Sequence, residues 1–178
     1  MSRTKKLTVS ALIAAVCVIC LALSLVIPRV TLSLAALAGI FPAALVMVCG
    51  YAWAAGAAAT AALLALLLLP DKTAGIWFLF FFGHYPIWKA LIEGLQAKIG
   101  KPWLGWALKL LGFAVCMALL YFLFGKLFAA GIPYAFSEYT AGPYILVIAL
   151  LLAFVVYDIA FSILINWFRI KILPKLQG

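Results

Sequence analysis

The chain has 178 residues, of which 70% are apolar and 10% are charged, and its mean hydropathy is +1.29. Soluble globular domains have about 45–50% apolar and about 25% charged residues, and disordered chains are depleted in apolar residues, so this composition excludes both classes. Thirteen Lys and Arg residues against four Asp and Glu residues give a formal charge of +9. In a membrane protein we interpret such basic residues first as signals of topology, and only then as a surface that binds nucleic acid. We therefore predict a single all-α domain in a membrane.

Six apolar segments are long enough to be membrane-spanning helices. A helix needs about 20 mostly apolar residues to cross about 30 Å of hydrocarbon. Continuous apolar runs, such as residues 61–69, favour helices over the alternating strands of a membrane barrel. In chain order, the predicted spans cover residues 8–27, 31–49, 51–69, 75–96, 105–129 and 143–168.

The first segment is predicted to be a retained helix rather than a cleaved signal peptide. Its apolar run has roughly 20 residues, whereas the apolar core of a signal peptide has about 7–15. Pro28 and Arg29, which follow the run, also do not fit the small-residue pattern of a cleavage site.

The basic residues predict that both termini are cytoplasmic. Nine of the thirteen Lys and Arg residues lie at the N-terminus, in or next to the connection between the fourth and fifth spans, or at the C-terminus. Cytoplasmic loops are enriched in these residues, and six spans place both termini on one side. An alternative topology is open at Gly50, because the second and third spans meet there almost without a loop. If these two segments form one re-entrant unit that counts as a single crossing, the termini lie on opposite sides.

The four cysteines all lie within predicted spans, at Cys17, Cys20, Cys49 and Cys116. Cys17 and Cys20 form a C-x-x-C pair, but no second Cys pair or His pair has metal-ligand spacing. We therefore expect the cysteines to behave as small hydrophobic residues. No disulfide, metal or cofactor is predicted.

Small residues recur at helical spacing in the first and third spans. Rows of this kind let helix backbones approach closely in a membrane. They favour either packing within the chain or docking of a partner's helix. The rows contain Ala11 and Ala15 in the first span, and Gly50, Ala54, Ala58 and Ala62 in the third.

Ionisable residues within the fourth and sixth spans are costly, and each is a functional hypothesis. His84 lies near the middle of the fourth span beside Pro86, which favours a kink. Lys89 and Glu93 follow at a spacing that places both on one helix face. Asp158 of the sixth span has a depth comparable to that of Lys89, so we predict an ion pair between them. A packing role and a proton or cation pathway through His84, Lys89 and Asp158 are both open.

Aromatic and polar residues collect at the side opposite the termini. They form either an interfacial aromatic belt with solvated loops, or a substrate pocket that the aromatic segment 133–143 covers as a lid.

Motifs of catalysis are absent from the sequence. It contains no P-loop, no H-E-x-x-H and no G-x-S-x-G, and His84 is the only histidine. We therefore expect a protein that is not an enzyme. Two functions without transport are alternatives: a scaffold subunit of a cell-envelope complex, which needs no outer cavity, and a protein that handles a lipid-linked carrier, which needs a lateral opening between helices.

Several features of the sequence form one pattern. They are the size of the chain, its six predicted spans, the opening KKLTVSALIAA at residues 5–15, the segment LSLAALAG at residues 32–39 and the alanine-rich third span. With it, the whole chain resembles the substrate-binding S component of energy-coupling factor vitamin transporters. The vitamin-specific pocket signatures of that family are absent, so the ligand stays open.

The resemblance implies a capture subunit in a bacterial plasma membrane, which binds a small micronutrient at the outer face and works with a transmembrane scaffold subunit and a pair of ATPases. It implies contact with the scaffold through an A-x-x-x-A motif, matched here by Ala11 and Ala15. Cations in the pocket suit a carboxylate or phosphate, and aromatic rings suit a flat heterocycle. The substrate-binding residues that it implies are Arg29, Trp77, Lys126, Tyr134, Glu138, Tyr139 and Tyr144.

Overall fold

A computed structural model describes residues 1–131 and 142–171 of the chain. These residues are helical almost throughout and contain no strand, which confirms the all-α prediction for them. The chain forms two compact units, Met1–Lys109 and Leu110–Gly178. The prediction of one domain stays a prediction.

The first unit contains nearly all of the helical elements. In chain order they are α1 (Arg3–Ala22), the single turns η1 (Leu23–Leu25) and η2 (Pro28–Val30), α2 (Thr31–Ala38), α3 (Ile40–Cys49), α4 (Tyr51–Leu68), α5 (Thr73–Trp77), the π-helical η3 (Phe78–Phe82), α6 (Tyr85–Ile99) and the first residues of α7 (Pro102–Gly131). The second unit contains the rest of α7 and α9 (Gly142–Lys171).

Four helical segments of the described residues are long and apolar enough to cross a membrane: Arg3–Leu25, Thr31–Cys49, Tyr51–Leu68 and Ile148–Lys171. They correspond to the first, second, third and sixth predicted spans. The fifth predicted span lies in α7, where Trp103–Leu119 is a shorter apolar helix. The long apolar helices fit an integral membrane protein.

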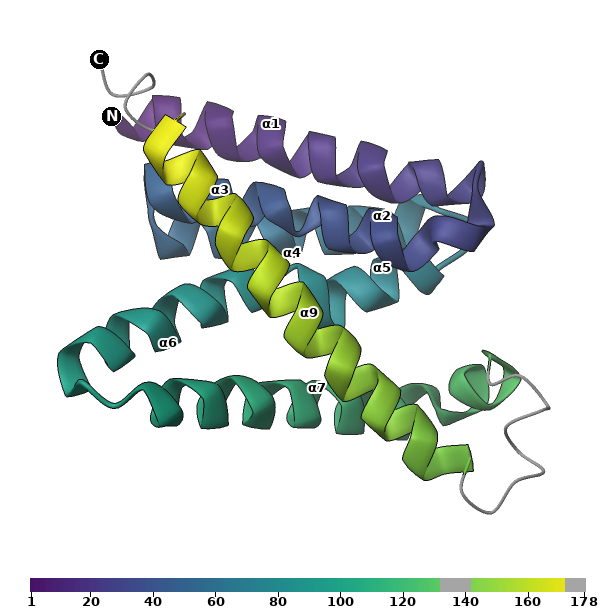
Figure 1. Ribbon diagram of the computed structural model, residues 1–178. Coiled ribbons are helices and arrows are strands. Elements are labelled where there is room, and N and C mark those ends of the chain that lie inside the picture. Colours follow the sequence, from purple (N-terminus) through teal and green to yellow (C-terminus); the bar gives the residue numbers. More distant parts are fainter. Residues whose placement is uncertain (132–141, 172–178) are drawn as a thin grey trace. The chain divides into compact units, whose positions relative to one another are not determined.

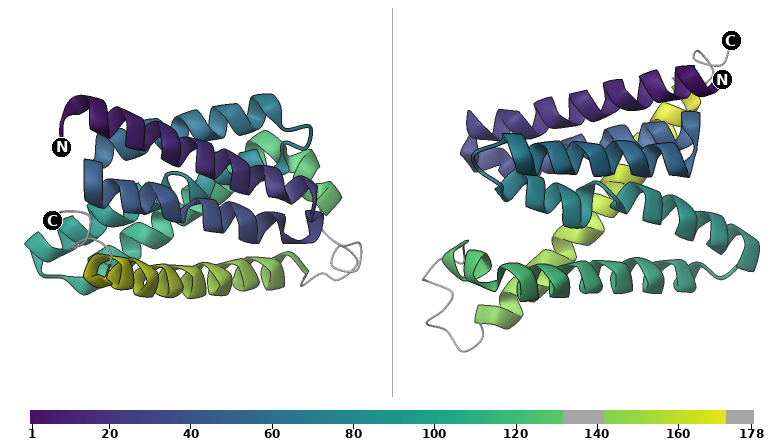
Figure 2. Two further views of the ribbon diagram at one scale, coloured as in Figure 1. Left: turned by 90° about the horizontal axis from the view of Figure 1, so that it is seen from above. Right: turned by 180° about the vertical axis from the view of Figure 1, so that it is seen from behind.

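Four helical segments of the first unit run alternately in opposite directions: α1, α2 with α3, α4, and α5 with η3 and α6 (Figure 1). Figure 2 shows the same alternation from two further sides. The N-terminus and the connection at Gly100 therefore lie at one end of this unit, and η2 and the connection at residues 69–72 lie at the other. The first end carries Arg3, Lys5, Lys6, Lys98 and Lys101.

The core of the first unit is built on a row of alanines along α4. Small side chains let α1 and α4, which are in contact, approach each other closely. Most of the small-residue row predicted for the third span is thus used for packing within the chain. The buried members are Ala54, Ala57, Ala58, Ala61, Ala62 and Ala65.

The helix of the second span is interrupted at Gly39. Pro42 has no N–H to donate to the Ala38 carbonyl, and the thiol of the fully buried Cys17 donates to that oxygen from α1, with an Sγ–O distance of 3.4 Å. A Cβ on Gly39 would lie 2.6 Å from the backbone oxygen of Phe82, so a glycine is needed for η3 to pack there.

Aromatic side chains hold the described part of the second unit together. Phe113 of α7 stacks on Phe154 of α9, with ring centroids 4.6 Å apart and an interplanar angle of 24°. One turn further along α9, Tyr157 lies 5.5 Å from Phe161, measured between ring centroids. Asp158 is buried in this region, with 2% of its surface exposed.

A candidate functional site on the fourth predicted span

The fourth predicted span is broken near its midpoint. The sequence predicts one helix over residues 75–96 with a kink beside Pro86, whereas the structure has α5, η3, a turn at Gly83 and His84, and then α6. The Gly83 N–H donates to the Phe78 carbonyl at 2.7 Å, which is the wider i→i−5 pattern of a π-helix. Pro86 has no N–H with which to continue the helix, so the break has a local cause.

His84 supplies a hydrogen bond at this break. Its Nδ1 lies 3.0 Å from the carbonyl oxygen of Leu79, and in the tautomer with a proton on Nδ1 the ring donates to that oxygen. The imidazole also borders a pocket of about 140 Å³, whose opposite wall is formed by alanines of α4. Broken helices with polar groups at mid-membrane depth form the substrate and ion sites of many transporters.

Further along α6, one carboxylate oxygen joins two buried lysines. Lys89 Nζ lies 3.1 Å and Lys109 Nζ 3.0 Å from the same Glu93 Oε1. Lys89 is 1% and Lys109 6% exposed, whereas the Glu93 side chain is 47% exposed. Lys89 and Glu93 thus share a helix face as predicted, and the ion pairs compensate the charges of the two buried lysines.

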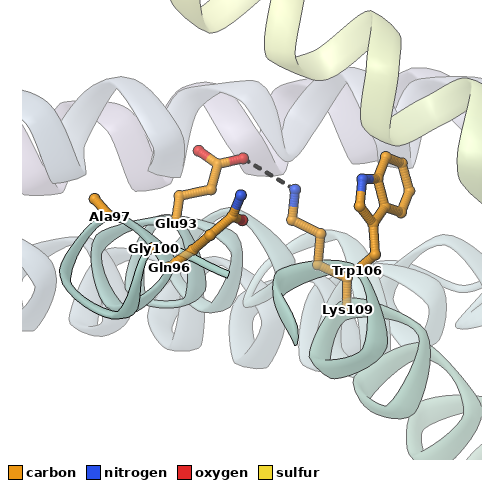
Figure 3. A pocket seen from close by; sticks show the side chains of 6 residues that line it. All are labelled: Glu93, Gln96, Ala97, Gly100, Trp106 and Lys109. Atoms are coloured by element: carbon orange, nitrogen blue, oxygen red, sulfur yellow. Dashed lines mark hydrogen bonds and ion pairs between the residues drawn. The ribbon is translucent and has the colours of Figure 1, made fainter. Parts of the chain in front are cut away.

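A pocket of about 460 Å³ opens beside these ion pairs (Figure 3). Glu93 and Lys109 point toward each other in it, and the Trp106 ring lies beside Lys109, with its centroid 5.4 Å from Nζ. Gly100 adopts φ 71° and ends α6, which turns the chain into α7. The lining residues are Glu93, Gln96, Ala97, Gly100, Trp106 and Lys109.

The sequence pattern places Lys109 among the basic residues next to the connection between the fourth and fifth spans, and it does not predict that Lys109 belongs to this site. Lys109 lies one to two turns inside an apolar helix that follows a short connection. That position is the signal that it faces the preceding helix rather than water.

The predicted ion pair between Lys89 and Asp158 joins residues of the two units and stays a prediction. Both side chains are buried, with 1% and 2% of their surfaces exposed.

Of the residues implied to bind substrate, Arg29 and Trp77 have described side chains. Arg29 is exposed in η2 and Trp77 is half-buried at the end of α5, and both elements belong to the end of the first unit opposite the N-terminus (Figure 1). Lys126 lies in α7 and Tyr144 in α9, with side chains outside the described part. Tyr134, Glu138 and Tyr139 lie outside the described residues.

Asp71 and Thr73 form a local hydrogen-bonded turn at the same end of the first unit. The Thr73 backbone N–H donates to Asp71 Oδ1 at 2.9 Å. Hydrogen bonds from the side chain and the backbone of Thr73 lower the pKa of Asp71 below its ordinary value of 3.8. Asp71 is therefore ionised at neutral pH, next in sequence to the exposed Lys72.

Ala11 and Ala15, the residues implied to dock a partner, are exposed on α1. Ala11 lines a groove of about 560 Å³ between α1 and α4. Most of the other lining residues are small. They are Leu7, Ser10 and Ala14 of α1, and Ala52, Trp53, Gly56, Ala57 and Thr60 of α4.

Comparison of the chain with protein-family models, with curated proteins and with solved structures gave no match. The resemblance to S components therefore rests on the sequence pattern alone. Among the described residues, no group of three or more His, Cys, Asp or Glu side chains is placed to hold a metal ion.

Proposed function

We propose that this chain is the substrate-capture subunit of a micronutrient uptake transporter in a bacterial plasma membrane. It has six membrane spans with both termini in the cytoplasm, and its partners are a transmembrane scaffold subunit and a pair of ATPases. The groove between α1 and α4 gives this function its main support. Ala11 lies exposed in it, and its small residues leave room for a partner helix to approach at backbone distance.

The charges at the two ends of the first unit agree with this orientation. Arg3, Lys5, Lys98 and Lys101 lie at the end with the N-terminus, which the positive-inside bias assigns to the cytoplasm. The opposite end then faces outward. There, Arg29 is suited to bind a carboxylate or phosphate of the substrate and Trp77 to contact a flat ring.

Co-purification tests the proposal. The full-length tagged chain, extracted from native membranes in a mild detergent, is expected to bring down a polytopic scaffold protein and two ATPases. Mass spectrometry of the same sample is expected to identify a bound small molecule. Recovery of neither the ATPases nor a small molecule would remove the transport assignment in favour of a scaffold subunit.

Ala11→Trp is the variant that tests the groove. The indole fills the space that a partner helix needs, so the partners are expected to be lost while the bound small molecule is retained. Ala160→Trp is the matched control, because Ala160 is an exposed alanine of α9 outside the groove. Equal loss of the partners from both variants would contradict docking at the groove.

A further inference from the structure

The pocket of about 140 Å³ lies between α4 and the break that separates η3 from α6. One wall is formed by alanines of α4 whose spacing in the sequence places them on a single face of the helix. The opposite wall is formed by Phe78 and Leu79 of η3, Gly83 and His84 of the turn, and Ile87 of α6. The alanines of the first wall are Ala55, Ala58, Ala59 and Ala62.

Local features of the sequence keep this pocket open. An alanine side chain ends at Cβ, so the α4 wall contains no group long enough to reach across. Gly83 has no side chain at all, and a Cβ at this position would lie 2.8 Å from the Phe78 backbone oxygen, so a larger residue does not fit there without a shift. The space therefore follows from the residue types on both walls.

The pocket has a buried floor and an exposed rim. Ala58 and Ala62 are 6% and 1% exposed, and Phe78 is fully buried. Ala55 and Ala59, on the same face of α4, are exposed. The rim therefore gives a small molecule access to an apolar floor.

The size and the lining of the pocket indicate an uncharged aromatic ring as its ligand. Protein interiors contain few voids larger than a water molecule, and an apolar cavity of about 150 Å³ in another protein stays dry and binds benzene. Among the residues that line the present pocket, His84 alone is polar. The rings of Phe78 and His84 are surfaces on which another ring packs well, edge to face or offset.

We propose that this pocket binds a single uncharged aromatic ring, such as that of benzene or of a larger compound that carries a phenyl group. The ring lies on the floor against Ala58, Ala62 and Phe78, and its substituents point to the rim. The residues of α4 that line this pocket are different from those that line the groove between α1 and α4. The site is therefore independent of the proposed transport function.

Fluorine NMR of fluorobenzene with the full chain in detergent tests the site, with empty micelles as the reference. We expect a saturable change in the fluorine signal that unlabelled benzene reverses. At the same concentration n-hexane, which has the same number of carbon atoms in a chain, is expected not to reverse it. Equal displacement by n-hexane would overturn the assignment of an aromatic ring in favour of an acyl chain. A fluorine signal that shows no saturable change would overturn the site itself.

A variant that fills the pocket tests its location. Ala59→Phe places a phenyl ring at the rim and is expected to weaken fluorobenzene binding roughly tenfold or more. Ala15→Phe is the matched control, because Ala15 is an exposed alanine of α1 that does not line the pocket, and it is expected to bind as the native chain does. Thermal unfolding shows whether both variants are folded. Full binding by a folded Ala59→Phe variant, or an equal loss in both variants, would contradict the proposal.

Discussion

Cys17 contributes a hydrogen bond at the point where Pro42 removes one. The thiol is fully buried and donates to the Ala38 carbonyl. That carbonyl receives no helical hydrogen bond from the residue four positions further along, because this residue is Pro42 and has no N–H. We predict that Cys17→Ala lowers the free energy of unfolding by about 1–2 kcal/mol, because it leaves this buried carbonyl without its donor. Cys17→Ser keeps a donor and is expected to lose less. Chemical unfolding in detergent measures the difference, and equal losses would show that the hydrogen bond contributes nothing.

Glu93 holds two buried ammonium groups on one oxygen. Glu93→Gln removes the charge but keeps the shape, so Lys89 and Lys109 lose the carboxylate they share. Removing one partner of a fully buried ion pair costs about 3–5 kcal/mol, and because Glu93 is half-exposed we expect a smaller loss, of about 1–3 kcal/mol. Lys98→Gln, on an exposed residue, is the control, with a change within about 0.5 kcal/mol. Unfolding midpoints that match for the two variants would contradict this role of Glu93.

At the scale of the elements, substitutions at two glycines distinguish the effect of close packing on stability from that of helix propensity. Gly39→Ala places a Cβ against the Phe82 backbone, and backbone cannot move aside as a flexible side chain can. We expect a loss of about 1–3 kcal/mol in stability. Gly94 lies within α6 with open space where its Cβ would be, so Gly94→Ala is expected to stabilise the helix by up to about 1 kcal/mol. Opposite signs in thermal unfolding are the expected result. Unchanged stability of Gly39→Ala would contradict the close approach of Gly39 to the Phe82 backbone.

The break between η3 and α6 is expected to exchange amide hydrogens faster than an intact span. A π-helical segment followed by a turn and a proline has fewer regular backbone hydrogen bonds than α4. Hydrogen exchange in lipid nanodiscs should therefore be faster over residues 79–88 than over residues 54–65. Pro86→Ala restores a donor and is expected to slow exchange in the first segment only. Equal protection of both segments in the native protein would contradict a break at this depth.

The sequence predicts the elements where one local pattern is sufficient. Uninterrupted apolar runs bounded by Gly50 and Pro70 define the third span, and a four-residue spacing places Lys89 and Glu93 on one face. It does not predict the π-helical turn at η3, because the choice between i→i−4 and i→i−5 bonds depends on how Phe78 and Gly83 pack. Nor does it place Lys109 on Glu93, since that contact depends on the geometry of the turn at Gly100.

At the scale of the whole molecule, charge and helix direction support the same orientation. The basic N-terminus and the basic connection at Gly100 lie at one end of the first unit, although nearly a hundred residues separate them in the sequence. An even number of crossings between these two positions produces this arrangement. If the second and third segments together made a single crossing, three crossings would remain between these positions and would put them on opposite sides of the membrane.

Cysteine labelling in intact cells decides between these two topologies. The variants Thr4→Cys, Lys101→Cys and Gln177→Cys are expected to react with a membrane-impermeant maleimide only after lysis, and Asp71→Cys is expected to react in intact cells. The unmodified chain is the background control, and it measures any reaction of the half-buried Cys116, since Cys17, Cys20 and Cys49 are buried. Six spans with cytoplasmic termini require positions 4, 101 and 177 to behave alike. Labelling of position 4 on one side and of position 101 on the other would show an odd number of crossings between them and would contradict the placement of Arg29 and Trp77 on one outer face. Labelling of position 177 on the side opposite to position 101 would contradict the fifth and sixth spans.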